Sequence, residues 1–220
     1  MSPTDILADV AARHPEAVPI LHAHDLDFAL EGHLTLEDAC RTRGLVAAEV
    51  LDAVARQASP GGRDWEDQPI LALVQRLAER HAGLGEQLDR ACELAETALR
   101  SHGHNVHLRL PAIYSALRDL RRDLADHVER ARRGLVPALV AGDVRRVDEH
   151  AEVMRVTHAG LGVALRSLRT LTHDFAPPVD DSPSLTALCA LLVDVERALR
   201  EAMHFEGYVL FLRALGRAAA

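Results

Sequence analysis

From residue 69 onward, apolar residues recur every three or four positions, which is the spacing of one face of an α-helix. The pattern predicts four long helices of about 30 residues each, a length typical of helical bundles rather than of single globular helices. Their apolar seams run over Ile70–Ala95, Ile113–Leu135, Val147–Leu168 and Leu185–Val209. Because each seam is continuous, we expect the helices to enclose one core as an up-down four-helix bundle.

The part of the chain before this bundle breaks into shorter segments. Capping residues and prolines predict helices from Thr4 to Arg13, from Pro15 to about His24, and from Val46 to about Gln57. Another helix is predicted to begin at Thr35, together with Asp38. Pro, Gly and charged residues then gather between Ser59 and Gln68, and a second such linker spans Ala176–Ser184. The predicted organisation is a small helical domain at 1–58, a linker at 59–68 and a bundle at 69–220.

Composition narrows the class of protein. Aromatic residues make up only 3% of the chain, and Ala, Leu, Arg and Glu dominate, which is typical of an all-α fold. The net charge of −8 and the absence of a basic stripe argue against nucleic acid as a partner. Neither a signal peptide nor an apolar run long enough for a membrane span is visible, so we expect a cytoplasmic protein without membrane contact. The scattered cysteines Cys40, Cys92 and Cys189 fit that reducing compartment and exclude a cysteine-based metal site.

Each apolar seam is interrupted by a residue that can bind metal: His81, His127, His158 and Glu206. A buried carboxylate costs several kcal/mol unless it is paired, protonated or coordinated. Imidazole and carboxylate groups are also the usual ligands of iron, zinc and manganese inside helical bundles. The pattern therefore predicts a metal site in the bundle core. The alternative is a set of independently hydrogen-bonded polar residues.

The remaining histidines are weaker candidates. Those near the N-terminus are expected to be solvated: His14, His22, His24 and His33. A dense loop holds His102, His104 and His107, and the margin of the third seam holds His150 and His173. His204 precedes Glu206 by two positions and points roughly 200° away from it on a helix, so we expect it at the surface or behind the ligands.

Several segments together identify a family. They are ILADVAARHPEAVPILHAHDLDFALEGHLTLEDAC, Asp64-Trp65 with the following PILALVQRLAERHAGLGEQL, HVERARRGLVP, EVMRVTHAGL, THDFAPP and AMHFEGYVLFLRAL. Over nearly its whole length the chain resembles the repair-of-iron-centres family. These are hemerythrin-like di-iron proteins with a short N-terminal ScdA-type domain. The resemblance implies a hemerythrin-like up-down bundle preceded by a small helical domain.

The resemblance assigns roles to the seam residues. His81, His127 and His158 match three of the family's four histidine ligands, and Glu206 matches one of its two bridging carboxylates. The other ligand positions hold residues that cannot coordinate, Ala131 and Ala202. The family's cysteine pair is replaced by Ala29-Leu30, and the glutamate before the third histidine is replaced by Thr157.

Family members are thought to restore damaged iron–sulfur clusters after nitrosative or oxidative stress. Because Ala131 and Ala202 remove ligands, we expect at most one metal here, with iron favoured and zinc or manganese as alternatives. If His158 cannot reach that metal, a set of two histidines and one carboxylate would remain. The leading prediction is a stress-response or iron-handling protein that acts on iron–sulfur proteins and forms a homodimer through its N-terminal domain. The alternatives are a metal-free helical interaction module and a mononuclear enzyme that reacts with oxygen or nitric oxide.

Overall fold

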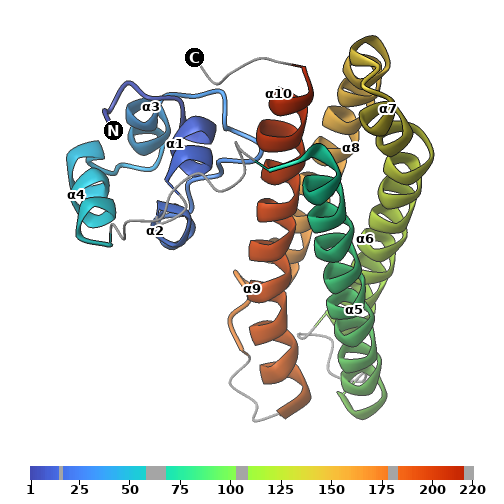
Figure 1. Ribbon diagram of the computed structural model, residues 1–220. Helices are drawn as coiled ribbons and strands as arrows, with labels where there is room; N and C mark the ends of the chain where they lie inside the picture. The colour runs from blue at the N-terminus through green and yellow to red at the C-terminus, as the bar shows by residue number, and fades with distance from the viewer. Residues whose placement is uncertain (15–16, 58–67, 103–108, 178–182, 216–220) are drawn as a thin grey trace.

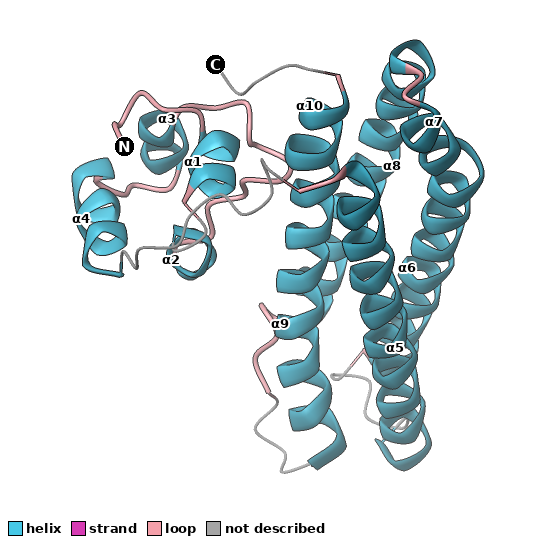
Figure 2. Ribbon diagram, in the orientation of Figure 1, coloured by secondary structure: helices cyan, strands magenta, loops and turns pink. Residues whose placement is uncertain are grey.

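The computed structural model describes residues 1–14, 17–57, 68–102, 109–177 and 183–215. Within these ranges the chain is helical, and its β-type pairing is limited to an isolated bridge between Ile6 and Thr35. Figure 1 and Figure 2 show a small helical unit at the N-terminus that packs against one side of a bundle of long helices. The all-α prediction is confirmed.

The N-terminal unit is built from short helices around its own core. The helices are α1 (Leu7–Arg13), α2 (Ala17–Ala23), α3 (Leu36–Thr42) and α4 (Ala47–Gln57). As predicted, Thr35 caps α3, because its side chain accepts a hydrogen bond from the Asp38 backbone N–H at 3.1 Å. The predicted helix start at Pro15 and the linker at 59–67 fall outside the described residues.

The predicted start of the first helix at Thr4 is wrong. The helix begins at Leu7, and no side chain caps it. Its first amides are instead satisfied by the loop that follows α2: Leu7 N–H donates to Leu34 O at 2.8 Å and Ala8 N–H to Gly32 O at 3.0 Å. A helix end with such backbone partners needs no capping side chain, and the partners lie too far along the chain for local sequence patterns to reveal them.

Four helical rods in the described residues form the bundle. They are α5 (Ile70–His102); α6 (Leu110–Arg130) continued by the π-helical η2 (Ala131–Leu135) and α7 (Val136–Ala141); α8 (Val144–Leu171); and α9 (Pro183–His204) continued by the π-helical η3 (Phe205–Leu210) and α10 (Phe211–Ala214). The rods lie side by side in Figure 1, where α5 packs against α6 and α9, and α6 packs against α8. None of the described helices combines the length and the apolar character that crossing a bilayer requires.

A tight turn joins α7 to α8. Gly142 adopts a φ of 66°, a left-handed conformation in which glycine has no Cβ to clash. Asp143 then caps α8 by accepting a hydrogen bond from the Arg146 backbone N–H at 3.1 Å. The turn holds α6 and α8 antiparallel, and so fixes the register between His127 and His158.

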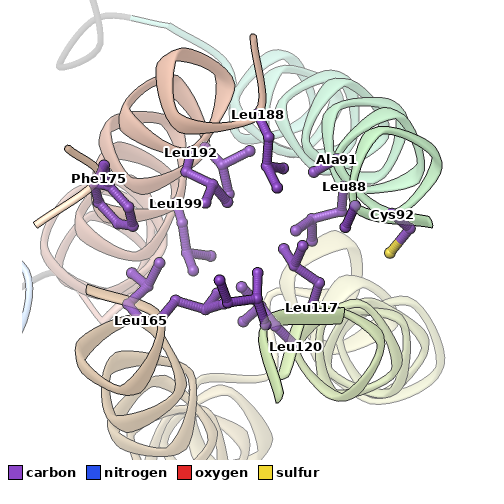
Figure 3. Close-up of a cluster of buried hydrophobic side chains, with 14 of the residues drawn as sticks. Leu88, Ala91, Cys92, Leu117, Leu120, Leu165, Phe175, Leu188, Leu192 and Leu199 are labelled. Atoms are coloured by element: carbon purple, nitrogen blue, oxygen red, sulfur yellow. The ribbon is translucent and has the colours of Figure 1, made fainter. Parts of the chain in front are cut away.

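The bundle core consists of two apolar clusters rather than one. The larger includes Leu84, Leu88, Leu117, Leu120, Leu124, Leu161, Leu165, Leu192, Leu199 and Ala202. Figure 3 shows part of it, with Leu88, Leu117, Leu165 and Leu199 among the labelled side chains. The smaller includes Leu73, Leu77, Ala131, Leu135, Met154, Val209, Leu210 and Phe211. Along every rod, the polar seam residue falls between a member of one cluster and a member of the other. A single polar layer therefore separates the two apolar halves of the bundle.

The N-terminal unit docks on α9 and η3 through polar and aromatic contacts. His204 Nε2 lies 3.0 Å from Ala8 O, and the His204 ring sits between Phe28 and Tyr208, with centroids 5.1 and 5.6 Å away. Nearby, a buried Arg200 donates to Glu196 Oε1 at 3.0 Å and to Asp25 Oδ1 at 3.1 Å. These contacts cover the side of the bundle that carries Glu206.

Candidate metal centre

The polar layer brings together one side chain from each rod. His81 lies on α5, His127 on α6, His158 on α8 and Glu206 on η3. All are buried, and Glu206 has no exposed surface at all. Their burial follows from their seam positions, since each replaces an apolar residue on the face that packs inward.

Glu206 contacts two of the three histidines in the layer. Its Oε2 lies 3.0 Å from His127 Nε2 and 2.9 Å from His158 Nε2. The His81 ring meets the His127 ring edge-on, with centroids 5.4 Å apart. One ligand atom each from His81, His127 and Glu206 lies within 4.8 Å of the others, which is close enough to share a metal ion. His158 falls outside that group but contacts the same carboxylate oxygen.

The second carboxylate oxygen of Glu206 has no hydrogen-bond partner among the residues that the structure describes. Glu206 Oε1 is fully buried and accepts no hydrogen bond. An unpaired buried carboxylate oxygen is costly, because its hydration has been lost without replacement. A cation placed between Oε1 and the neighbouring imidazole nitrogens would supply the missing partner. The residues present therefore fit a bound metal.

The protonation states also suit metal binding. Burial lowers the pKa of His81 to about 4, although Glu206 nearby acts in the opposite direction. His81 is therefore a neutral imidazole at neutral pH, which is the form that coordinates metals. Burial alone would raise the pKa of Glu206, but its contacts with the His127 and His158 rings outweigh burial and hold that pKa well below its ordinary value. Glu206 is thus a carboxylate anion.

Comparison with known proteins finds a family whose members match the region that contains the polar layer. The family model described as the hemerythrin HHE cation binding domain matches residues 72–214, a range that contains the whole polar layer. The chain belongs to the hemerythrin family. The resemblance seen in the sequence and the bundle seen in the structure are thereby confirmed.

Curated relatives of this hemerythrin chain extend over its N-terminal unit as well. The iron-sulfur cluster repair protein YtfE of Musicola paradisiaca is 30% identical over 221 residues, covering 95% of each chain. A probable iron-sulfur cluster repair protein of Haemophilus influenzae is 26% identical over 95% of this chain and 96% of its own. The YtfE protein of Edwardsiella ictaluri is 28% identical over 96% of both. The chain is therefore a divergent member of the repair family within the hemerythrins.

Two alanines border the layer of this hemerythrin domain. Ala131 belongs to the smaller apolar cluster and Ala202 to the larger, and both are buried. A methyl group cannot coordinate a metal, so neither position can complete a second metal site. Within the part of the chain that the structure describes, no second group of three ligand-bearing side chains comes together. The described part of the layer thus brings together one group of three possible metal ligands.

The sequence periodicity did not reveal that the second and the fourth rod turn π-helical at the layer. The η2 segment begins at Ala131, and η3 spans Glu206. Such π-helical turns are frequent at functional sites, where they re-aim side chains. A local signal was present for η2: Pro137 has no N–H and cannot bond the carbonyl of Arg133, which weakens the α-helical ladder there. A glycine, Gly134 or Gly207, also lies inside each segment.

Outside the layer, several histidines differ from the sequence prediction. His204 is buried against the N-terminal unit and is not one of the grouped ligands, so of its two predicted positions the one at the surface is wrong. His22 is not solvated either: its ring packs edge-on against Phe28 at 5.0 Å, and burial, followed by Arg200, lowers its pKa to about 4. The contact of His204 with Ala8 and the effect of Arg200 on His22 join residues that are far apart in sequence, so helix periodicity cannot predict them. His104 and His107 lie outside the described residues.

The buried His204 predicts a pH-dependent stability. Burial lowers its pKa to about 4, so the unfolded chain binds more protons than the native chain between about pH 6.5 and pH 4. The stability that neutral His204 contributes is present above pH 6.5 and is lost as the pH falls through this window. The loss for this residue is at most about 3 kcal/mol.

Urea denaturation of the metal-free protein at several pH values measures this effect. We expect His204→Gln, whose amide can still donate to Ala8 O, to flatten the dependence of the free energy of unfolding on pH. His173→Gln, at an exposed position after α8, serves as the matched control and should leave the dependence intact. Equal slopes for His204→Gln and the unmodified chain would show that His204 does not contribute.

Proposed function

We propose that this chain binds a single metal ion through His81, His127 and Glu206, with His158 as a fourth ligand. The observation that carries this proposal is the state of Glu206. One carboxylate oxygen is shared by two imidazole nitrogens and the other is buried without a partner. A bound cation would satisfy both the unpaired oxygen and the neutral His81 beside it.

We propose iron as the metal, with zinc or manganese as the alternatives that the same ligands accept. Two histidines and one carboxylate with open positions are typical of non-haem Fe(II) sites. Iron held in this way supplies one-electron redox chemistry and open positions for a small molecule such as oxygen or nitric oxide. The protein contributes the anionic Glu206, the neutral His81, and the apolar residues above and below the layer that limit the access of water.

We further propose a role in iron handling or in the response to nitrosative or oxidative stress, with iron–sulfur proteins as partners. The names of the full-length relatives support this proposal. The N-terminal unit has a structural role in it, because Ala29 and Leu30 provide no thiols and Leu30 packs against Gly162 of α8. The proposal includes a homodimer formed through this unit and a cytoplasmic location, where the buried cysteines stay reduced.

A cluster-repair assay tests the role. The protein is loaded anaerobically with Fe(II), mixed with an iron–sulfur protein damaged by nitric oxide or peroxide, and the recovery of cluster absorbance is followed. We expect recovery with the iron-loaded protein and none with His127→Ala, while His173→Ala should match the unmodified chain. Equal recovery with iron-loaded protein, metal-free protein and free Fe(II) would contradict the role.

One observation favours a second function, that of a metal-free interaction module. The direct contacts of His127 and His158 with Glu206 satisfy part of the layer without a metal. Metal content of protein purified without a histidine tag separates this function from the first. A spectral change when oxygen or nitric oxide is added to the Fe(II) form would instead indicate a mononuclear enzyme.

A further inference from the structure

Thr157 lies against His127 on the side of the ring that faces away from Glu206. Its Oγ1 is 2.8 Å from Met154 O, one turn earlier on α8, and 3.0 Å from His127 Nδ1. Donation from a threonine hydroxyl to a carbonyl one turn earlier is common in helices. A hydroxyl has only one proton, so when Thr157 donates it to Met154 O, its oxygen can only accept from His127. The proton between the two side chains then belongs to Nδ1.

This arrangement determines what the other ring nitrogen can do. A neutral His127 with its proton on Nδ1 carries a lone pair on Nε2. That lone pair faces Glu206 Oε2, another acceptor, at 3.0 Å. Two acceptors at this distance repel each other unless a cation binds them both or a proton lies between them. A metal held by His127 Nε2 removes the repulsion.

We propose that Thr157 is a positioning residue that holds His127 in the tautomer with its proton on Nδ1, leaving Nε2 to bind the metal. This inference rests on the proposed function. The family resemblance places a glutamate before the third histidine. In this chain that position is Thr157, whose hydroxyl is uncharged. Ligand histidines in metalloproteins typically need such a partner on the second nitrogen, which fixes the ring and raises its basicity.

If the Thr157 hydroxyl points the other way, the opposite tautomer of His127 is expected. If Thr157 donates to Nδ1, the proton of His127 sits on Nε2 and hydrogen-bonds to Glu206. That layer would be satisfied without a metal at His127. The protonation of the His127 ring in the metal-loaded protein therefore decides between the two orientations.

Substitutions at Thr157 test the inference through metal affinity. Thr157→Val keeps the shape of the half-buried side chain and removes the hydroxyl, whereas Thr157→Ser keeps the hydroxyl. We expect Zn²⁺ affinity, measured by competition with a chelator, to fall about 10–100-fold in Thr157→Val and to stay within about threefold in Thr157→Ser. Thr170→Val is the matched control, because the exposed Thr170 makes the same type of bond to Arg166 O on the same helix. Its affinity should not change.

Nitrogen-15 NMR of the Zn²⁺-loaded protein supplies a readout that a purely structural role would not move. We expect the His127 ring to show a proton on Nδ1 and metal-bound Nε2, with its signals assigned by their loss in His127→Gln. A proton on Nε2 would overturn the inference and remove His127 from the ligand set. Unchanged affinity in Thr157→Val would overturn the inference while leaving the metal site intact. Failure of the unmodified chain to bind Zn²⁺ or Fe(II) would overturn the proposed function, and this inference with it.

Discussion

The Glu206→Gln variant is expected to lose metal affinity by roughly 100-fold or more, because removal of even an outer partner of a ligand typically costs about 10–100-fold. Glutamine keeps the size of the side chain but removes the negative charge that His127 and His158 share. It also replaces one oxygen that a metal could bind with an amide nitrogen that cannot coordinate in the same way. Anaerobic titration with Fe(II), or chelator competition with Zn²⁺, measures the loss.

Glu196→Gln provides a matched control for this change. Glu196 is also a buried glutamate on the α9 rod, but its carboxylate pairs with Arg169 at 2.8 Å and with Arg200 at 3.0 Å, outside the polar layer. Its substitution should lower the free energy of unfolding, since it removes one charged partner from the buried Arg200 and from the half-buried Arg169. It should spare metal affinity. Equal metal affinity for Glu206→Gln and Glu196→Gln would rule Glu206 out as a ligand.

The combined substitution Ala131→Glu with Ala202→His is expected to add about one iron per chain. Ala131 follows His127 by four residues and Ala202 precedes Glu206 by four, so each lies near the face of a retained ligand. The new side chains would supply the carboxylate and the imidazole that a second metal position lacks. Overpacking of the apolar clusters that hold these alanines should cost roughly 1–3 kcal/mol in the metal-free form.

Anaerobic reconstitution with Fe(II), followed by oxidation, shows whether the second position forms. The double variant should develop the absorption of an oxo-bridged ferric pair, which the unmodified chain should lack. Each single variant is the control, because it still lacks one ligand and should remain at one iron. Identical iron content and spectra in the double variant and the unmodified chain would mean that packing has filled the space of the second metal position, so that restoring its ligands no longer creates a site.

The sequence predicted those parts of the fold and site that depend on local pattern. Seam periodicity placed His81, His127, His158 and Glu206 on inward faces, and each is buried in one layer. Capping chemistry correctly identified Thr35, because a helix cap involves residues only a few positions apart. These features are set by the period of the helix and by short-range hydrogen bonds.

The features that the sequence did not predict depend on contacts between distant segments. The first helix begins at Leu7 rather than at Thr4, because the loop after α2 satisfies its first amides. His204 is buried because Ala8, almost two hundred residues earlier in the chain, lies against it. The grouping of His81 and His127 with Glu206, and the place of His158 beside it, depend on helix register and on the π-helical turns. None of these is encoded in a repeating pattern.

Elemental analysis of the full chain, purified without a histidine tag and reconstituted anaerobically with Fe(II), tests the central claim most directly. The claim is that the polar layer is a site for one metal, bound by His81, His127 and Glu206 with His158 beside them. We expect about one iron per chain after desalting, and none above background in Glu206→Gln. Close to two irons per chain, or none in the unmodified protein, would contradict the claim.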